Sequence, residues 1–480
     1  MLVDRHTGEI LPRIGKPVYE IIEPASQKLL SNERYHQGLL STLEAADADV
    51  HRLLAQEYDR QQNTLQLIAA ENQCSRAVLA ALGSVVQNKT TEGFAGARFH
   101  GGCEVVDCLE TLAISRAREV FGAQYANVQP HSGTSANQIV LMAILEKGDR
   151  ILSLAMDQGG HVSHGAPVAL AGKIFEIEHY QVRPDDFLLD YDAIREQAMR
   201  FRPKLIICGA TAYSRTIEFA RFRAIADEVG AYLMADVSHI SGLISAGVHP
   251  SPVDHAHFTT TSTYKPGGPR GGLILMGRDF DRPFQAGSRT IPLWERIEKA
   301  TFPGFQGTPY LNNIAAKAVF FKEMLGDEYR GRQARIVENA KVLAEEFVRL
   351  GYDVLTGGTD NHMCLINVAN LRPRRTAASG SGMTGLIAQK SLEDCGIIVN
   401  MNRLPYDRHN ARITSGMRLG TPIVTKNGMS PVEMQIISQL VDRVLAHVET
   451  LSEREYRLDP AFADGIREQV HSLCLRFPMQ

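Results

Sequence analysis

The chain has 480 residues, of which 44% are hydrophobic and 22% charged, and its formal net charge is −3. These values are typical of a folded globular protein, and the length indicates two or three domains. So weak a charge gives no basic field for nucleic acid. No apolar run approaches the roughly 20 residues that cross a membrane.

The seven cysteines are scattered along the chain, and none stands in a spacing typical of metal binding. The start, MLVDRHTGEILPRIGKP, is charged and lacks the apolar core of a secretory signal. We therefore expect free thiols, a cytoplasmic location and no metal site.

In chain order, an N-terminal extension leads to a predicted helix that begins at Asp47, where apolar residues recur at helical spacing. A polar, glycine-rich run, NKTTEGFAGARFHGGCE, occupies residues 88–104. Its composition favours a surface loop, and an arm that reaches an active site is the alternative. A further helix is predicted over residues 105–121.

Strand-like and helical segments then alternate, with predicted strands RILSLA, KIFEIE, KLIICG and AYLMAD. This alternation predicts an α/β fold with a mostly parallel sheet and helices on both faces. A long helical segment after residue 315 leads to a smaller unit with strands YDVLT and MCLINVA. We expect an N-terminal extension and arm (1–74), a large domain (75–315) and a small C-terminal α+β domain (316–480).

Lys265 stands where a run of β-branched residues ends and a glycine-rich turn begins. A lysine held there, away from water, can act as a nucleophile in Schiff-base chemistry, although a solvated strand-end lysine is the alternative. Asp236 closes another apolar run. Such a pair is what a pyridoxal phosphate (PLP) enzyme needs, because the aspartate keeps the pyridine nitrogen protonated and the lysine carries the aldehyde.

Other polar residues occupy similar positions. Ligands of parallel α/β sheets bind at the carboxyl ends of the strands, where His161 and Thr211 are also expected. Small residues at 132–134 fall at a predicted helix start, whose free N–H groups suit a phosphate; a plain N-cap is the alternative. Arg418 is either a fork for a substrate carboxylate or a surface salt bridge.

Together these stretches resemble the serine hydroxymethyltransferase family of fold-type I PLP enzymes. The resemblance runs from about Asp47 to the C-terminus and rests on long segments in order. It implies a seven-stranded, mostly parallel sheet in the large domain, tetrahydrofolate as co-substrate, and a homodimer or dimer of dimers with shared active sites. The segments are AAENQCS, NKTTEGFAGARFHGGCEVVD, YANVQPHSGTSAN, QGGHVSHG, ADVSHISGLISAGVHPSPV, TTTSTYKPGGPRGG, FPGFQGTP, GGTDNH and SGMRLGTP.

Position by position, the resemblance implies how PLP is held. Lys265 matches the Schiff-base lysine, Asp236 pairs with the pyridinium nitrogen, and His161 stacks on the ring. For His161, a histidine of the core or a metal ligand in a His-x-x-His pair is the alternative. The other residues expected at the cofactor are His239, Ser132, Gly133, Thr134, Thr211 and Ser262, with Gly307 of the partner subunit.

The resemblance also implies a substrate and a folate site. Arg418 would bind the amino acid carboxylate, and Glu92 would handle the proton of the substrate hydroxyl. Thr90, Ala70 and Tyr264 are expected beside the substrate, and Phe99, His100, Met156, Gly160 and Asn402 beside the folate.

The sequence departs from the family's pattern around the substrate and folate, while the cofactor contacts stay. Thr90 replaces a tyrosine, Ala70 a serine, and Tyr264 the histidine before the lysine. Phe99 and His100 replace two adjacent tyrosines, Thr211 a serine and Met401 a lysine. The loop after the lysine is one residue shorter.

Thr90 removes an aromatic ring beside the substrate α-carbon, so the pocket gains room for a methyl group, worth ~1 kcal/mol. The chain therefore looks most like the α-methylserine branch of the family, which interconverts α-methyl-L-serine and tetrahydrofolate with D-alanine and methylenetetrahydrofolate. Three alternatives are an ordinary serine hydroxymethyltransferase, a folate-independent α-methylserine aldolase, and a PLP-binding protein without turnover. Glu92 argues against the last.

Overall fold

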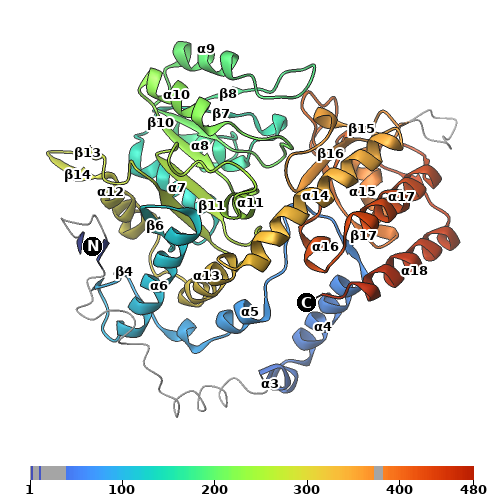
Figure 1. Ribbon diagram of the computed structural model, residues 1–480, viewed down its shortest axis with the longest axis horizontal. Coiled ribbons are helices and arrows are strands. Elements are labelled where there is room, and N and C mark those ends of the chain that lie inside the picture. Colours follow the sequence, from blue (N-terminus) through green and yellow to red (C-terminus); the bar gives the residue numbers. More distant parts are fainter. Residues whose placement is uncertain (1, 4–9, 12–38, 372–381, 480) are drawn as a thin grey trace.

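The computed structural model describes residues 2–3, 10–11, 39–371 and 382–479. Much of the predicted N-terminal extension lies outside these residues. Figure 1 shows a central sheet flanked by helices, and a smaller C-terminal part joined to it by the long helix α14 (Asp327–Arg349).

The central sheet has seven strands in the order β6-β12-β11-β10-β9-β7-β8. Every neighbouring pair is parallel except those of β12, which runs antiparallel to both β6 and β11. The predicted α/β class with a seven-stranded, mostly parallel sheet is confirmed. The strands are β6 (Tyr125–Asn127), β7 (Arg150–Leu154), β8 (Glu176–Tyr180), β9 (Leu205–Cys208), β10 (Tyr232–Asp236), β11 (Phe258–Ser262) and β12 (Gly272–Met276).

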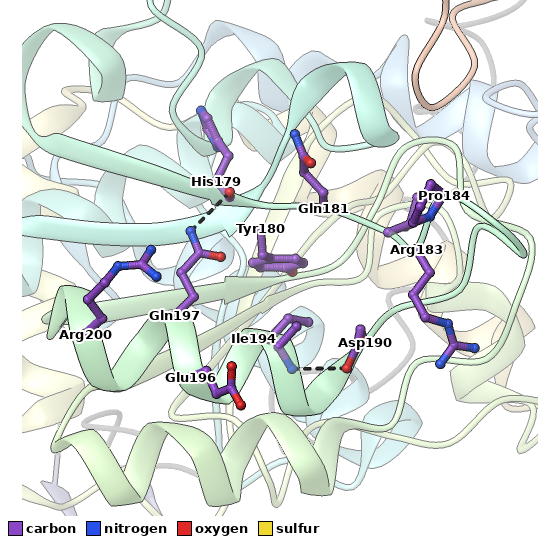
Figure 2. Close-up of a pocket in the computed structure, with 12 residues that line it drawn as sticks. His179, Tyr180, Gln181, Arg183, Pro184, Asp190, Ile194, Glu196, Gln197 and Arg200 are labelled. Carbon is purple, nitrogen blue, oxygen red and sulfur yellow. Dashed lines mark hydrogen bonds between the residues drawn. The ribbon is translucent and has the colours of Figure 1, made fainter.

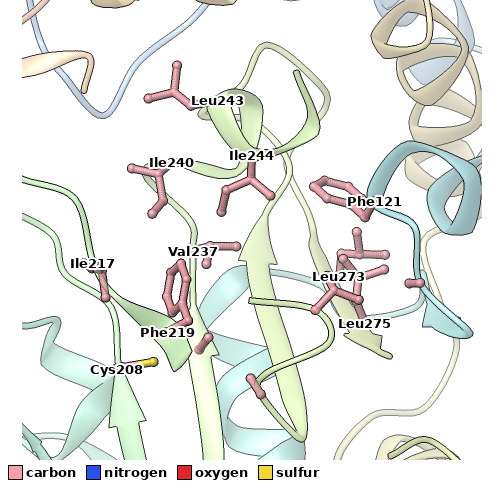
Figure 3. Close-up of a cluster of buried hydrophobic side chains, with 14 of the residues drawn as sticks. Phe121, Cys208, Ile217, Phe219, Val237, Ile240, Leu243, Ile244, Leu273 and Leu275 are labelled. Atoms are coloured by element: carbon pink, nitrogen blue, oxygen red, sulfur yellow. The ribbon is translucent and has the colours of Figure 1, made fainter. Parts of the chain in front are cut away.

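The inner strands are almost completely buried, as expected of a sheet covered by helices on both sides, although β11 is rich in threonine. Successive residues of β12 pack into hydrophobic clusters on opposite faces of the sheet, because side chains alternate across a strand. Leu273 and Leu275 pack into one hydrophobic cluster, and Ile274 and Met276 into the other. Figure 3 shows part of the first cluster.

Helices cover the sheet and end where the chain must turn. The helices α6 (Glu104–Phe121) and α10 (Phe219–Val229) each end at a glycine in the left-handed conformation, Gly122 and Gly230, which is a common helix stop. The other helices of this part are α5 (Arg76–Leu82), α7 (Gly133–Ile144), α8 (Leu170–Ile174), α9 (Tyr191–Phe201), α11 (Ser241–Ser245), α12 (Leu293–Lys299) and α13 (Leu311–Met324).

Two predicted strands are shorter than expected: YDVLT forms only the two-residue strand β15 (Asp353–Val354), and KIFEIE is the second case. In KIFEIE the first residues belong to the end of α8, and the strand β8 begins only at Glu176. A short apolar run fits a buried helix turn as well as a strand, so periodicity alone does not place the boundary.

The C-terminal part has its own sheet and its own core. Four antiparallel strands follow the order β15-β16-β19-β18. The long helix α14 contributes to both parts, with Ile336 in the first cluster and Phe347 in the C-terminal one. The elements are β15 (Asp353–Val354), β16 (Met363–Asn367), β17 (Ile397–Ile398), β18 (Asn400–Asn402), β19 (Gly416–Gly420), α15 (Gly385–Asp394), α16 (Pro422–Lys426), α17 (Pro431–His447) and α18 (Pro460–Arg476).

The described N-terminal segment packs with this C-terminal part. The strand β3 (Leu65–Gln66) pairs in parallel with β17. The helix α4 (Ala48–Asn63) lies beside α18 and buries none of its own residues (Figure 1). The predicted domain boundaries stay a prediction. The remaining elements are β1 (Leu2–Val3), β2 (Ile10–Leu11), α3 (Leu39–Ala46), β4 (Gly93–Phe94), β5 (Ala97–Arg98), β13 (Pro283–Ala286), β14 (Arg289–Pro292), β20 (Glu449–Thr450) and β21 (Tyr456–Arg457).

Candidate active site

Asp236 is a buried carboxylate at the carboxyl end of β10. Its Oδ2 atom accepts hydrogen bonds from Asn137 Nδ2 at 2.8 Å and His164 Nε2 at 2.9 Å. Its Oδ1 atom accepts from the backbone N–H and the hydroxyl of Ser238, at 3.0 and 2.6 Å. Burial alone would raise the pKa of this carboxyl, but the hydrogen bonds and the nearby histidines outweigh it and hold the pKa well below its usual range.

His161 lies on the same network. Its Nδ1 atom is 2.7 Å from the hydroxyl of Ser163, which Asn137 also contacts at 2.9 Å. Burial lowers the pKa of His161 to about 4, against the opposing effect of Asp236. The ring is therefore neutral at physiological pH, as suits a side chain that stacks on a cofactor.

His161, His164 and Asp236 each place a possible ligand atom within 4.8 Å of the others. A carboxylate can only accept, so the His164 Nε2 atom that faces Asp236 carries a proton and has no lone pair for a metal. This arrangement disfavours a metal, whose absence stays a prediction.

Lys265 follows β11, the strand next to β10. Its Nζ atom donates to Ser262 Oγ at 3.1 Å and lies 4.7 Å from the centre of the Tyr264 ring. The backbone carbonyl of Lys265 accepts from Asn72 at 3.2 Å. The lysine is therefore held on the carboxyl edge of the sheet, one strand from Asp236.

The predicted phosphate seat adjoins Lys265. Ser132 caps α7, its hydroxyl accepting from the Ser135 N–H at 3.0 Å. A side chain at Gly133 would meet Ser262 at 3.2 Å and the Ser238 hydroxyl at 3.3 Å, so glycine eases the close approach of the helix start to these residues. Thr134 is exposed at the same helix start.

Arg418 is a buried cation on β19. It donates to the Thr211 carbonyl at 2.7 Å and to Asn400 Oδ1 at 3.1 Å. No ion pair joins it to an acidic side chain in the described part of the chain. Burial lowers the pKa of Arg418 to about 10, which leaves it charged. A buried, charged guanidinium without an anion is suited to a ligand carboxylate.

The rings of His239 and His362 are stacked, with their centres 5.7 Å apart. Both residues line a small pocket together with Lys265. Burial lowers the pKa of both rings, that of His362 to about 3, so both are neutral. His362 Nε2 donates to the carbonyl of Ala69 at 3.1 Å. Ala70 follows directly, and Ala69 packs against Gly420 of β19, which brings Ala70 near the strand of Arg418.

Glu92, Thr90, Phe99 and His100 form a second group on the segment around the β4–β5 hairpin, which we call the arm (residues 89–100). The side chains of Thr90, Phe99 and His100 are exposed, and 74% of Phe99 is accessible. Glu92 lies 4.0 Å from the position that a side chain at Gly307 would take. Within the described residues, no hydrogen bond or ion pair joins Glu92 to Lys265, Asp236 or Arg418. One chain alone therefore does not connect the two groups.

Three predicted folate residues remain. Met156 and Gly160 follow β7, and Asn402 lies in the C-terminal part. Met156 begins a short 3-10 helix (Met156–Gln158) and is exposed, while Gly160 is packed too tightly for a side chain. Asn402 lies on β18, and its neighbour Arg403 is 3.9 Å from Asp157. Asn402 and Met401 therefore come from the C-terminal part toward the Met156 loop.

The sequence predicts no role for Asn137, Ser238 and His362, and for His164 only that of a metal ligand with His161, although all four contact predicted site residues. His164 had a usable signal in the His-x-x-His spacing. Asn137 had none, since it lies in the middle of α7 and meets Asp236 only through the tertiary fold.

A larger cleft than the pocket beside Lys265 lies elsewhere. A cleft of about 490 Å³ opens between the end of β8 and α9 and is lined by polar residues such as Arg183, Gln197 and Arg200 (Figure 2). No predicted site residue lines it. Among the described helices, none is long and apolar enough to span a bilayer.

A lysine, an ionised carboxylate, a neutral histidine ring and a helix N-terminus thus share one edge of a mostly parallel sheet. That donor set fits each part of PLP, and with this fold it defines the class of fold-type I PLP enzymes. A model of the serine hydroxymethyltransferase family matches residues 43–441. A curated protein named serine hydroxymethyltransferase, from Rhodospirillum centenum, is 46% identical over 435 residues, covering 90% of this chain and 95% of the relative.

The chain belongs to the serine hydroxymethyltransferase family. Enzymes of this family use PLP, with tetrahydrofolate as the co-substrate that carries the one-carbon unit. The predictions of family and cofactors are confirmed, and the roles of the individual site residues stay predictions.

Proposed function

We propose that this enzyme interconverts α-methyl-L-serine and tetrahydrofolate with D-alanine and 5,10-methylenetetrahydrofolate. The observation that carries the proposal is Thr90, where the family has a tyrosine. A threonine leaves room for a methyl group beside the substrate α-carbon, and filling such a space is worth ~1 kcal/mol or somewhat more. Thr90 is exposed in its own chain, which leaves it accessible to a second copy in this proposal.

The arm supplies its residues to the active site of the partner subunit in this proposal. Glu92 and Thr90 lie on the arm and have no hydrogen bond to the Lys265 group of their own chain within the described residues. Gly307 lies beside Glu92. A homodimer, or a dimer of dimers, in which each arm completes the neighbouring site accounts for both observations.

When bound, PLP supplies an electron sink for the pair left on the α-carbon after the hydroxymethyl carbon departs. Asp236 holds the positive charge at the pyridine nitrogen, and His161 supports the ring. Lys265 would hold the aldehyde group of the cofactor. Ser132, Gly133 and Thr134 bind the phosphate, with help from Gly307 of the partner subunit. Ser262, Thr211 and His239 border the ring.

Arg418 binds the substrate carboxylate, which supplies the anion that this buried guanidinium lacks. Glu92 holds the proton of the substrate hydroxyl as the bond between the α-carbon and the hydroxymethyl carbon breaks. α-Methylserine has no α-hydrogen, so this cleavage is the productive route. Protonation of the α-carbon then gives alanine. Ala70 and Tyr264 complete the substrate pocket.

Tetrahydrofolate takes up the one-carbon unit. Phe99 offers an exposed ring for stacking, and His100, Met156, Gly160 and Asn402 complete the folate site in this proposal. We also propose a cytoplasmic location and the three-part organisation given by residues 1–74, 75–315 and 316–480.

An ordinary serine hydroxymethyltransferase is the second candidate, favoured by the 46% identity to the relative of that name. The variant Thr90→Tyr separates the two. We expect loss of α-methylserine turnover, with serine or glycine activity kept or gained. Thr290→Tyr, on the exposed hairpin of β13 and β14, is the matched control. Unchanged α-methylserine turnover in Thr90→Tyr would remove Thr90 as the selector.

A further inference from the structure

Lys317 is a fully buried lysine in the middle of α13, away from the residues assigned to the reaction. Its Nζ atom donates to three backbone carbonyls, those of Val128 at 2.6 Å, Gly272 at 2.8 Å and Pro130 at 3.3 Å. It makes no ion pair within the described residues. An ammonium has three N–H donors, so each has one acceptor.

Those three carbonyls join two segments of the site. Val128 and Pro130 lie between the end of β6 and Ser132, the cap of α7. Gly272 begins β12 and stands opposite Ser262, whose hydroxyl accepts from Lys265. Lys317 therefore ties the turn before the phosphate seat to the strand beside Lys265.

The start of β12 packs closely against both Lys317 and Ser132. A side chain at Gly271 would meet the Lys317 Cε atom at 2.4 Å, and one at Gly272 would meet the Ser132 carbonyl at 2.1 Å. The turn is also held from a second direction, because Gln306 donates to the Gln129 carbonyl and accepts from the His131 N–H. The N-terminus of α7 thus has a fixed position relative to Lys265.

An apolar residue of similar length would fill the same space without the cost of burying a charge. Burial lowers the pKa of Lys317 to about 7, opposed by Glu110, and the three carbonyl acceptors favour the charged form. The ammonium therefore acts here through the three hydrogen bonds that it donates.

We propose that Lys317 is a positioning residue for the cofactor phosphate: its ammonium fixes the Val128–Pro130 turn so that the start of α7 presents its N–H groups beside Lys265. This inference rests on the proposed placement of the phosphate at residues 132–134. It predicts a loss that is selective for the phosphate of PLP, whereas a general packing defect weakens every form of the cofactor.

The test compares PLP with pyridoxal, which lacks the phosphate, by titrating the full-length apoenzyme and following the Schiff-base absorbance. For Lys317→Met we expect a dissociation constant for PLP that is roughly tenfold to a hundredfold larger, by analogy with the loss of outer-shell partners at metal sites. The constant for pyridoxal changes by less than about threefold, within the scatter of surface substitutions. Lys322→Met, an exposed lysine on the same helix, is the control and binds both as the wild type does.

Lys317→Gln keeps two N–H donors and replaces Lys317→Met in the test if the methionine variant does not fold. For Lys317→Gln we expect a smaller loss of PLP affinity, again without a loss of pyridoxal affinity. Equal weakening of PLP and pyridoxal, or no weakening of either, would overturn the role of Lys317. A wild type that binds pyridoxal as tightly as PLP would overturn it too, by removing the phosphate seat. The titration contains no amino acid or folate, so its outcome is independent of the substrate preference proposed above.

Discussion

The Nε2 atom of His164 lies 2.9 Å from the Oδ2 atom of Asp236, and both side chains are buried. This contact lowers the pKa of the Asp236 carboxyl in spite of its burial. In His164→Ala the pKa of Asp236 rises toward the working range, so we expect turnover to fall by roughly tenfold to a hundredfold. The acid limb of the pH–rate profile moves to higher pH.

His164→Gln is the matched variant because its amide can still donate to the carboxylate. We expect most of the turnover and the original acid limb to return. An alanine variant with an unshifted acid limb would show that His164 does not control Asp236.

A substitution of Arg418 should abolish amino acid binding without lowering the stability of the ligand-free enzyme. Arg418→Met removes a buried cation that has no anionic partner in the described chain, which offsets the loss of its two hydrogen bonds, so we expect little change in the melting temperature of the ligand-free enzyme. The amino acid raises the melting temperature of the wild type by binding the folded state only. We expect no such rise in the variant.

Arg200→Met, at an exposed arginine paired with Glu178, is the control for this experiment and keeps the stabilisation by amino acid. A methionine variant that α-methylserine still stabilises would place the carboxylate elsewhere.

Arg98 anchors the arm through a buried network. It contacts Asp107 at 2.8 Å, Glu110 at 2.5 Å and the Gly93 carbonyl at 2.6 Å. Arg98→Met leaves two buried carboxylates without their cation, which costs about 3–5 kcal/mol in comparable pairs. We expect a large fall in the melting temperature and a loss of activity through displacement of Glu92.

The surface pair of Arg195 and Glu228 gives the contrast. Arg195→Met removes an exposed ion pair of a kind worth about 0–1 kcal/mol, so little change in melting temperature is expected. Equal effects of the two substitutions would contradict the structural role of the arm network.

The lowered pKa of His362 makes the free energy of unfolding depend on pH. Burial lowers its pKa to about 3 in the folded chain, below the ordinary histidine value of 6.5. The unfolded chain therefore binds the extra proton first. The contribution of neutral His362 is present above about pH 6.5 and is lost as the pH falls toward 3, at about 1.4 kcal/mol per pH unit.

Urea unfolding of the wild type and His362→Asn between pH 7 and pH 5 measures this dependence. The free energy of unfolding of the wild type exceeds that of His362→Asn by less as the pH falls, because only the wild type carries the titrating ring. Parallel pH dependences would contradict a buried neutral His362.

Sequence alone predicted the sheet and its carboxyl edge because buried strands and helix starts leave local patterns. Lys265, Asp236 and Ser132 were found this way, each at the end of an apolar run or the start of a helix. Asn137 and Lys317 were not, since their partners lie far along the chain and meet them only through packing. The exposed Thr90 shows the same limit: its own chain supplies the residue, and the pocket it shapes in our proposal belongs to a partner.

The most direct test of the proposed function offers L-serine and α-methyl-L-serine separately to the PLP-loaded enzyme, each with and without tetrahydrofolate. We predict folate-dependent release of D-alanine from α-methylserine and little glycine from serine. Alanine release that is independent of folate would instead identify an aldolase. Rapid, folate-dependent formation of glycine from serine, with little alanine, would contradict the account and return the enzyme to the ordinary serine hydroxymethyltransferase reaction.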